Sequence, residues 1–576
     1  MRAIKSKLIK DRLLSGLLIL GVLFLLSNVF LHFHHAKNVE LEPYDVTLIC
    51  ESVPAPVFSV PEGIYGQPFE LEIQAPEGYD IFYTTDGSIP TVYSNRYKKP
   101  MMVDPRKNIN RKILTIPTSF LWRAPYGKQN HCVVFRARCF RNGAGYGKVV
   151  NVIYSTPKIR QHQDFQIVHI LMDADSLFSP QRGIYIPGEK YYSKKALVAL
   201  EKFPEKGLNY HPANYYQRGK RWARPATFIL MNVSGETFFE QNIILNVRGV
   251  VSRILPEKSL RITADNQNDT VIRYSFFNEL PYSSYKRLIL RNSGSDIRST
   301  MFRDALIHRL ANGTKVDVQA YTPSVVYING NYWGIHNIHE NQDEHYLAAK
   351  YASSLQDISI LYKVDYVPLA VKYGQESSLK SFEELLNFIL ENSLANHETY
   401  HAVCAQIDVD NFIDYMILQT FFANWDWPNN NVKIFRLDRQ TELMSQQGID
   451  AGKWRWFFFD LDGGMEFEPS VNMYERLRDE FDQQIVTQIF RKFMENKEFK
   501  DQFITRYEYL VKNQLTSEKM LEQINLFEQR YRPEIERQIS RWRLLKSTQY
   551  WQQEVEFLRN FVKERPEIVL KQLEAL

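Results

Sequence analysis

Two buried segments, each ending in an acidic turn, most limit what this chain can fold into. The almost wholly apolar stretch Asn411 to Phe422 predicts a buried helix, and Ala423-Asn424-Trp425-Asp426-Trp427-Pro428-Asn429-Asn430-Asn431 follows it directly. Trp454 to Phe459 predicts a buried strand that ends in Asp460-Leu461-Asp462-Gly463-Gly464. A carboxylate at the end of a rigid buried element is well placed for chemistry. We therefore predict a site that both turns share.

The spacing within these turns indicates a kind of chemistry. Asp426 and Asn431 stand five residues apart, and Asp460 follows a strand or two later. Enzymes that transfer phosphate from ATP to protein hydroxyls use an Asp to accept the hydroxyl proton, an Asn five residues on for metal, and a second Asp for metal. Each turn alone has a structural interpretation, because Asp426 can form an Asx turn and the second turn can be a plain loop. Their combination favours a site.

Length and charge restrict the class of protein. A chain of 576 residues exceeds the size of one hydrophobic core, so two to four domains are expected. The net charge of +5 is too small for this length to indicate a nucleic-acid partner, and we expect none. The four cysteines fit no metal-binding or disulfide-framework spacing.

The N-terminal residues predict a membrane anchor. Residues 1–12 are basic, and Leu13 to Phe33 contains no charged residue. At about 1.5 Å per helical residue, such a run spans a hydrocarbon core of about 30 Å. The basic flank predicts a cytoplasmic tail over 1–12, a single-pass anchor in the cell membrane over 13–33 and an extracytoplasmic bulk after a linker over 34–53. A cleaved signal peptide is the alternative, but the apolar run is long for one and no A-x-A-like site follows it.

Residues 54–156 predict an all-β, immunoglobulin-like sandwich. Short alternating strands such as Phe69 to Ile73 are separated by turn signals such as Asp86-Gly87. Ile81-Phe82-Tyr83-Thr84-Thr85-Asp86-Gly87-Ser88-Ile89-Pro90-Thr91 resembles the signature of the domain found at the C-terminal end of chitobiase and related glycoside hydrolases. That resemblance implies the fold and a possible glycan contact. We expect the segment to fold by itself, because the character of the sequence changes after Pro157.

A second domain begins with a predicted strand at Gln166 to Asp173. Arg248-Gly249-Val250-Val251-Ser252 follows a predicted hairpin, and Lys258 opens the next strand. Such a turn can present backbone N–H groups to phosphate, and a lysine supplies a point charge. The same pattern also occurs in an ordinary hairpin with an exposed lysine.

Helices alternate with strands in the rest of this domain. Ser299 to Ala311 predicts a helix that carries Asp304. Asp304 either pairs with Lys258, as the acidic helix residue of a kinase pairs with its lysine, or favours the helix dipole as a first-turn acid, which we prefer. A hairpin is predicted to end at Glu340. The region beyond Glu475 predicts helices with solvated charged faces, interrupted near Ser517 and Pro533.

From about Gln166 to the C-terminus the chain resembles the CotH-like spore-coat protein kinases. The pieces that carry the resemblance are Arg248-Gly249 with Ser252 and Lys258, Arg303-Asp304, Tyr327 to Gly334 with Glu340, Asn424-Trp425-Asp426 with Asn429 to Asn431, and Asp460-Leu461-Asp462. The resemblance implies an α+β, two-lobed atypical kinase fold over 166–576. Its parts would be an N-lobe over 166–340, a C-lobe core over 341–465 and a helical region over 466–576. It also implies ATP, Mg²⁺ or Mn²⁺, and transfer to Ser or Thr hydroxyls.

The resemblance assigns roles to individual residues. Asp426 would be catalytic. Arg248, Ser252, Lys258 and Glu340 would bind nucleotide, and Asn431, Asp460 and Asp462 would hold metal. The chain departs from kinase patterns in its poor glycine-rich loop and in Asn424-Trp425, which replaces His-Arg before Asp426. Two functions follow: a membrane-anchored extracytoplasmic kinase acting on a surface or secreted protein, or an inactive kinase-like scaffold or carbohydrate-binding protein.

Overall fold

A computed structural model of the chain describes residues 54–107, 111–189, 191, 212–265, 270–363 and 368–574. The predicted tail, anchor and linker, residues 1–53, lie outside these ranges. Within them, no helix is both long and apolar enough to cross a membrane. An N-terminal region rich in sheet precedes a C-terminal α+β region, which confirms the predicted order of fold classes at this level.

The N-terminal region is built on a five-stranded sheet in the order β2-β9-β8-β5-β6. Its strands are β2 (Gly63–Ile64), β5 (Asp80–Thr84), β6 (Asn95–Arg96), β8 (Cys132–Arg141) and β9 (Ala144–Ser155). Two further pairs are β1 (Val57–Phe58) with β4 (Ile73–Gln74), and β3 (Phe69–Leu71) with β7 (Met101–Val103). Leu71, Ile81, Phe135 and Tyr154 form the centre of its core.

A nine-stranded sheet follows, in the order β17-β20-β16-β13-β12-β11-β10-β18-β19. Its strands are β10 (Gln166–Leu171), β11 (Arg224–Met231), β12 (Thr237–Val247), β13 (Leu260–Ala264), β16 (Arg287–Arg291), β17 (Tyr321–Thr322), β18 (Ser324–Ile328), β19 (Asn331–Ile335) and β20 (Asn337–Glu340). All neighbours pair antiparallel except β10 and β18. Ile167 and Val168 of β10 belong to different core clusters, so both faces of the sheet are covered. Helix α4 (Arg303–Ala311) packs in the first cluster, and α2 (Ala174–Phe178) in the second.

The two predicted turns belong to a smaller unit with a four-stranded sheet, β22-β21-β23-β24. Its strands are β21 (Ile358–Lys363), β22 (Ala370–Tyr373), β23 (Val432–Leu437) and β24 (Arg455–Trp456), and its helices are α5 (Glu344–Tyr351), α6 (Glu376–Glu391), α7 (His397–Cys404), α8 (Val409–Phe421) and α9 (Glu442–Gln446). Helix α8 is buried at every residue from Asn411 to Phe421, as predicted. Strand β24 is shorter than predicted, although the chain stays buried through Phe459.

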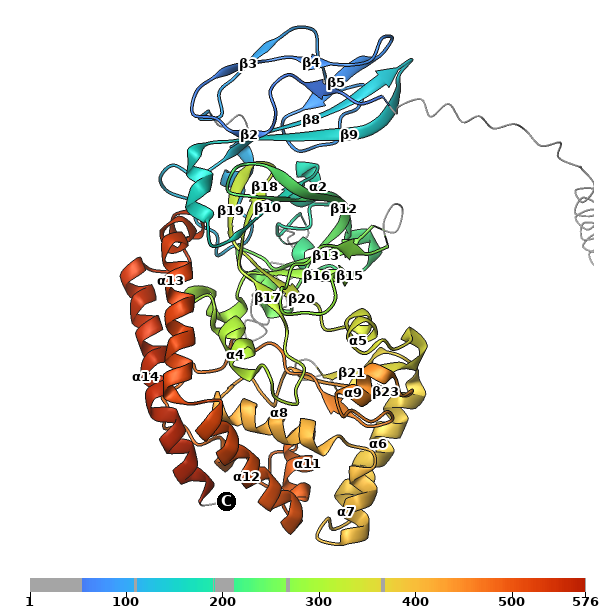
Figure 1. The fold of residues 1–576 in the computed structure, drawn as a ribbon, viewed down its shortest axis with the longest axis vertical. Coiled ribbons are helices and arrows are strands. Elements are labelled where there is room, and N and C mark those ends of the chain that lie inside the picture. Colours follow the sequence, from blue (N-terminus) through green and yellow to red (C-terminus); the bar gives the residue numbers. More distant parts are fainter. Residues whose placement is uncertain are drawn as a thin grey trace, which may run out of the picture. The chain divides into compact units, whose positions relative to one another are not determined.

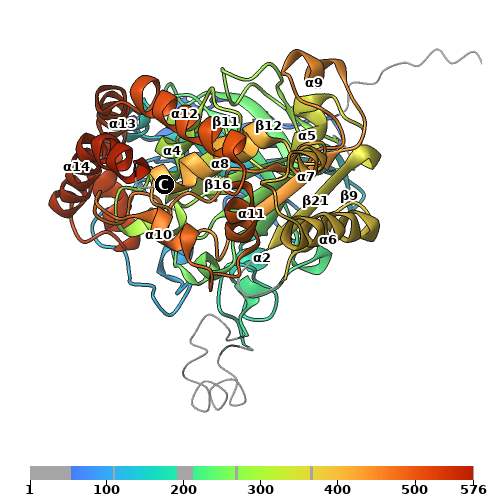
Figure 2. The ribbon, with the colours of Figure 1, turned by 90° about the horizontal axis from the view of Figure 1, so that it is seen from below.

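Helices complete the chain: α10 (Met473–Arg478), α11 (Ile485–Phe493), α12 (Lys497–Asn513), α13 (Ser517–Trp542) and α14 (Thr548–Leu573). Helices α13 and α14 run side by side (Figure 1), and α12 packs against α8 (Figure 2). The prediction of a break at Pro533 was wrong, because this residue lies inside α13. A proline removes one backbone hydrogen bond, and here buried neighbours such as Tyr531 and Ile535 anchor the helix on both sides.

Contacts cross the predicted boundary at residue 156, between the N-terminal sheet-rich region and the nine-stranded sheet. The Cys132 amide donates to the Gly330 carbonyl across 2.7 Å, and the guanidinium of Arg136 donates to Thr227 Oγ1 across 2.9 Å. Ile113 and Leu114 are buried in the same cluster as the strands of the large sheet. The two regions therefore share apolar core, and independent folding of residues 54–156 stays a prediction.

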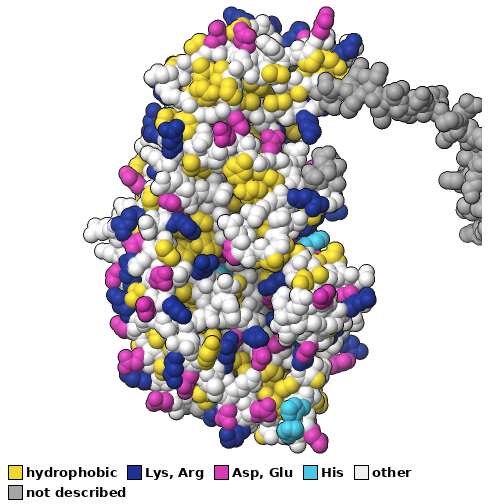
Figure 3. Space-filling view, viewed as in Figure 1, with side chains coloured by type: hydrophobic (Ala, Val, Ile, Leu, Met, Phe, Trp, Pro, Cys, Tyr) yellow, Lys and Arg dark blue, Asp and Glu magenta, His cyan; other side chains and the backbone are white. Residues whose placement is uncertain are grey.

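Acidic and basic side chains are interspersed on the face shown in Figure 3. This distribution agrees with the small net charge of +5.

Candidate functional site

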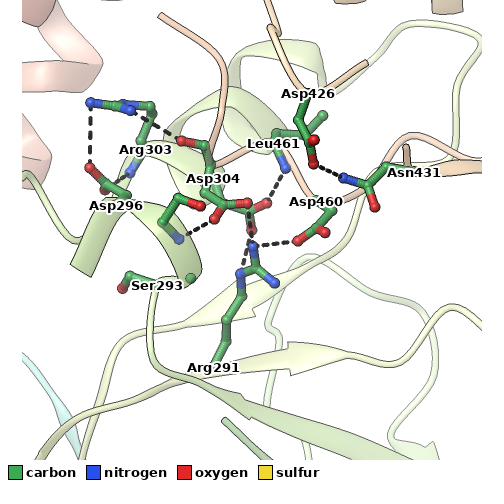
Figure 4. Close-up of polar contacts among 12 residues, drawn as sticks. Arg291, Ser293, Asp296, Arg303, Asp304, Asp426, Asn431, Asp460 and Leu461 are labelled. Atoms are coloured by element: carbon green, nitrogen blue, oxygen red, sulfur yellow. Dashed lines mark hydrogen bonds and ion pairs between the residues drawn. The ribbon is translucent and has the colours of Figure 1, made fainter. Parts of the chain in front are cut away.

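The turn after α8 holds the carboxylate of Asp426 in a fixed orientation. The side-chain amide of Asn430 donates to Asp426 Oδ1 across 2.7 Å, and that of Asn431 donates to Oδ2 across 2.8 Å. Figure 4 shows the contact with Asn431. Trp427 anchors the turn, since its buried ring donates from Nε1 to the Tyr415 hydroxyl across 2.8 Å. Asp426 itself is half-buried. Its carboxylate is thus oriented by two neutral donors while part of the residue remains accessible.

The second turn brings Asp460 and Asp462 to the same place. The Trp425 amide donates to the Gly463 carbonyl across 3.3 Å, which connects the two acidic turns directly. Asn431 and Asp460 both have left-handed backbone, with φ of 61° and 59°. Asn and Asp tolerate this region better than other side chains, and such conformations cluster at functional sites. The sequence predicted that the two turns share a site, and the structure brings them into contact.

Arg291 ties this acidic group together, and sequence reasoning missed it. It ends β16, and its Nη2 donates to Asp460 Oδ1 across 2.7 Å and to Asp462 Oδ1 across 2.9 Å. Its Nε lies 3.5 Å from Asp304 Oδ2, and Asp304 Oδ1 accepts the Leu461 amide across 2.7 Å (Figure 4). The available signal was its position at the end of the strand before the helix that carries Asp304.

Burial and neighbouring charges both shift the pKa values within this group. Burial alone would raise the pKa of Asp304, but the charge of Arg291 outweighs it and lowers the pKa to about 2. Burial, and then the charge of Asp460, raise the pKa of Asp462 to about 7. Burial would lower the pKa of Arg291, yet the three surrounding acids raise it above its usual value. The guanidinium therefore remains charged and partly compensates three carboxylates.

The residues present suit a metal held jointly with a nucleotide. Asn431, Asp460 and Asp462 offer hard oxygen ligands, the type that Mg²⁺ and Mn²⁺ take. Within the described ranges, no three His, Cys, Asp or Glu side chains are arranged to hold a metal by themselves. Mg²⁺ is usually bound by one or two carboxylates together with substrate phosphates, so this donor set fits the metal of a nucleotide complex.

Lys258 lies away from the acidic group. Its buried Nζ donates to the carbonyls of Arg253 and Leu255, across 2.8 and 2.6 Å, and lies 4.2 Å from the centre of the Tyr215 ring. Burial, and then the charge of Arg253, lower its pKa well below the usual value. The considered pair between Lys258 and Asp304 does not form. Asp304 pairs with Arg291 instead, and it stands in the first turn of α4, as the preferred alternative predicted.

The other predicted nucleotide residues differ in their surroundings. Burial lowers the pKa of Arg248, and the charges of Tyr362 and Asp460 oppose that shift, so its side chain lies near the acidic group. The backbone amide of Arg248 donates to the Ser259 carbonyl across 2.8 Å, and Ser252 lies in a short 3₁₀ turn, Val251–Ile254, in place of an open glycine-rich loop. Glu340 is buried at the end of β20, where it accepts the Tyr282 hydroxyl and, across 3.1 Å, the Ala320 amide. Burial raises the pKa of Glu340 to about 7. Glu340 thus contacts Tyr282 and Ala320, which are not members of the acidic group.

Comparisons with known protein families match two segments. Residues 245–569 match the model of the CotH kinase protein family, and residues 60–115 match the chitobiase/beta-hexosaminidase C-terminal domain. Both families and their order confirm the resemblances found in the sequence. A search of curated proteins found no match.

Proposed function

The chain belongs to the CotH kinase protein family, and from that premise we propose that it transfers the γ-phosphate of ATP to a Ser or Thr hydroxyl of a surface or secreted protein. One observation carries the proposal: the Asp426 carboxylate is held by two amides in a turn that also contains Asn431 and touches the Asp460 turn. Phosphoryl transfer depends mainly on such positioning and on charge stabilisation.

Asp426 accepts the proton of the acceptor hydroxyl in this proposal. The amides of Asn430 and Asn431 fix the orientation of its carboxylate, which reduces the reorganisation needed to receive the proton. Asn431 and Asp460 would hold Mg²⁺, which supplies positive charge to the nucleotide phosphates when bound. Asp460 is preferred over Asp462, because its side chain is 35% exposed against 10% and Asp462 also accepts the Ser295 amide.

Nucleotide binding is expected to depend on Mg²⁺ and on Asp460. Calorimetric titration of the purified protein with ATP should show binding with Mg²⁺, and Asp460→Ala should weaken it by about tenfold or more, because a metal ligand is lost. Equal ATP affinity with and without Mg²⁺, together with wild-type affinity in the variant, would refute the metal assignment. Nucleotide binding without transfer to any Ser-rich or Thr-rich protein would favour the inactive scaffold.

We also propose that the chain is a single-pass protein of the cell membrane with its bulk outside the cytoplasm. The charge-free residues 13–33 and the basic residues before them support this orientation. A reporter fused after Lys37 is expected to be active only on the extracytoplasmic side. Activity in the cytoplasm, or a mature N-terminus near Ala36, would contradict the anchor.

A further inference from the structure

We propose that Arg291 is the cation that binds nucleotide phosphate in this site; the inference rests on the proposed function. Protein kinases carry this cation on the strand that precedes an acidic helix, and they pair it with an acid of that helix. Here β16 precedes α4, and Arg291 at the end of β16 pairs with Asp304 of α4 across 3.5 Å. Lys258 belongs to an earlier part of the sheet and is bonded to two carbonyls.

The guanidinium of Arg291 has a donor available for this role. Nη2 serves Asp460 and Asp462, and Nε faces Asp304. Within the described residues Nη1 makes no hydrogen bond, and Figure 4 shows one nitrogen of this group without a dashed line. The side chain is 18% exposed. A planar fork with five N–H donors can hold several carboxylates and still donate to a phosphate oxygen.

Through Asp304, Arg291 also influences the position of the turn that contains Asp460 and Asp462. The same carboxylate that faces Arg291 accepts the Leu461 amide across 2.7 Å, between Asp460 and Asp462. Arg291 thus holds the side chains of this turn, and Asp304 holds its backbone. Loss of the guanidinium charge should therefore weaken binding of the nucleotide–metal complex and reduce transfer as well.

The test compares Arg291→Gln, Arg291→Lys and a matched control. Gln keeps a hydrogen-bond donor without charge, and Lys keeps the charge with a different geometry. Arg287→Gln is the control, because Arg287 lies on the same strand and pairs with Asp343 and Glu344, each across 2.7 Å. Lys258→Gln tests the assignment that the sequence favoured. ATP–Mg²⁺ affinity is measured by calorimetry, and transfer in a single turnover, at a temperature where circular dichroism shows each variant folded.

The expected order of ATP–Mg²⁺ affinity is wild type, then Arg291→Lys, then Arg291→Gln, with the last about tenfold or more below wild type. Transfer should follow the same order, and Arg287→Gln should remain within about twofold of wild type in affinity.

Wild-type affinity in Arg291→Gln, or loss of affinity in Lys258→Gln alone, would overturn the inference while leaving the proposed function intact. If Arg291→Gln does not fold, a several-fold deficit in Arg291→Lys supports the inference and equal affinity overturns it. A wild type that binds no nucleotide refutes the proposed function, and the inference with it.

Discussion

The Asp426→Asn variant is expected to bind ATP with wild-type affinity and to lose phosphoryl transfer by about 10²- to 10⁴-fold, the usual contribution of a positioned general base. Asn has nearly the same shape as Asp but cannot take the hydroxyl proton. The structure favours a separation of roles, because the amides of Asn430 and Asn431 orient the Asp426 carboxylate, whereas Arg291 pairs with Asp304. Single-turnover transfer to a Ser-rich acceptor, beside calorimetric titration with ATP and Mg²⁺, measures both effects.

Asp410, in the helix α8 that precedes the Asp426 turn, provides the control for this experiment. Asp410 lies exposed in the first turn of α8, where it accepts Gln502 Nε2 across 2.9 Å. Asp410→Asn should leave both ATP binding and transfer near wild type. It weakens only a surface hydrogen bond at the N-terminal end of α8, whereas Asp426 follows the C-terminal end. Transfer at the wild-type rate in Asp426→Asn would show that another group accepts the proton. Loss of ATP binding in that variant would place Asp426 on the nucleotide or its metal.

The parts of the site that the sequence could predict are those set by local pattern. An apolar run long enough for a buried helix predicted α8, and five-residue spacing within one turn linked Asp426 to Asn431 before any contact was known. Burial of Trp454 to Phe459 likewise predicted that Asp460 would end a buried segment, although regular pairing covers only Arg455 and Trp456. Pattern was enough here because each feature is determined within about a dozen residues.

The parts that could not be predicted depend on contacts between distant residues. Arg291 meets Asp460 across 169 positions of sequence, and its place at the end of the strand before the Asp304 helix does not by itself show this contact. For Lys258, the sequence pattern suggested a role that its contacts in the structure do not favour. A lysine beside a turn suggests an exposed charge, yet here two backbone carbonyls and aromatic rings compensate its burial. The assignment of a phosphate-binding cation therefore required the contacts of Arg291 with Asp304 and Asp460, which the chain order of β16 and α4 does not show.

The core shared across the predicted boundary at residue 156 also depends on contacts between distant residues. Turn signals and strand alternation predict the sandwich region, because they are local. The segment around Ile113 and Leu114 instead contributes to a core formed with residues of the large sheet, including Phe228 and Trp333. A sequence pattern shows that such side chains are buried, but not which neighbours bury them.

Removal of residues 54–156 is expected to prevent stable folding of the kinase-like region. Ile113 and Leu114 are 2% and 4% exposed, and each buried aliphatic side chain contributes about 1.5–3 kcal/mol. The deletion would also leave the Gly330 carbonyl without the Cys132 amide and Thr227 without Arg136. Such losses are large against a typical unfolding free energy of about 5–15 kcal/mol. Thermal unfolding of a chain that begins at Pro157 measures the effect.

A single substitution tests the same shared core without deleting a region. Leu114→Ala is expected to lower the free energy of unfolding by about 2–5 kcal/mol, the range for a buried leucine. Ile89→Ala is the matched control, because Ile89 is 52% exposed in the same region and its truncation should cost less than about 0.5 kcal/mol. Both are compared by denaturant unfolding, with ATP binding as a second readout.

If the chain from Pro157 unfolds cooperatively at the temperature of the longer chain and binds ATP equally well, the region over residues 54–156 is independent. In that case the contacts at Gly330 and Thr227 would only join two separately stable units.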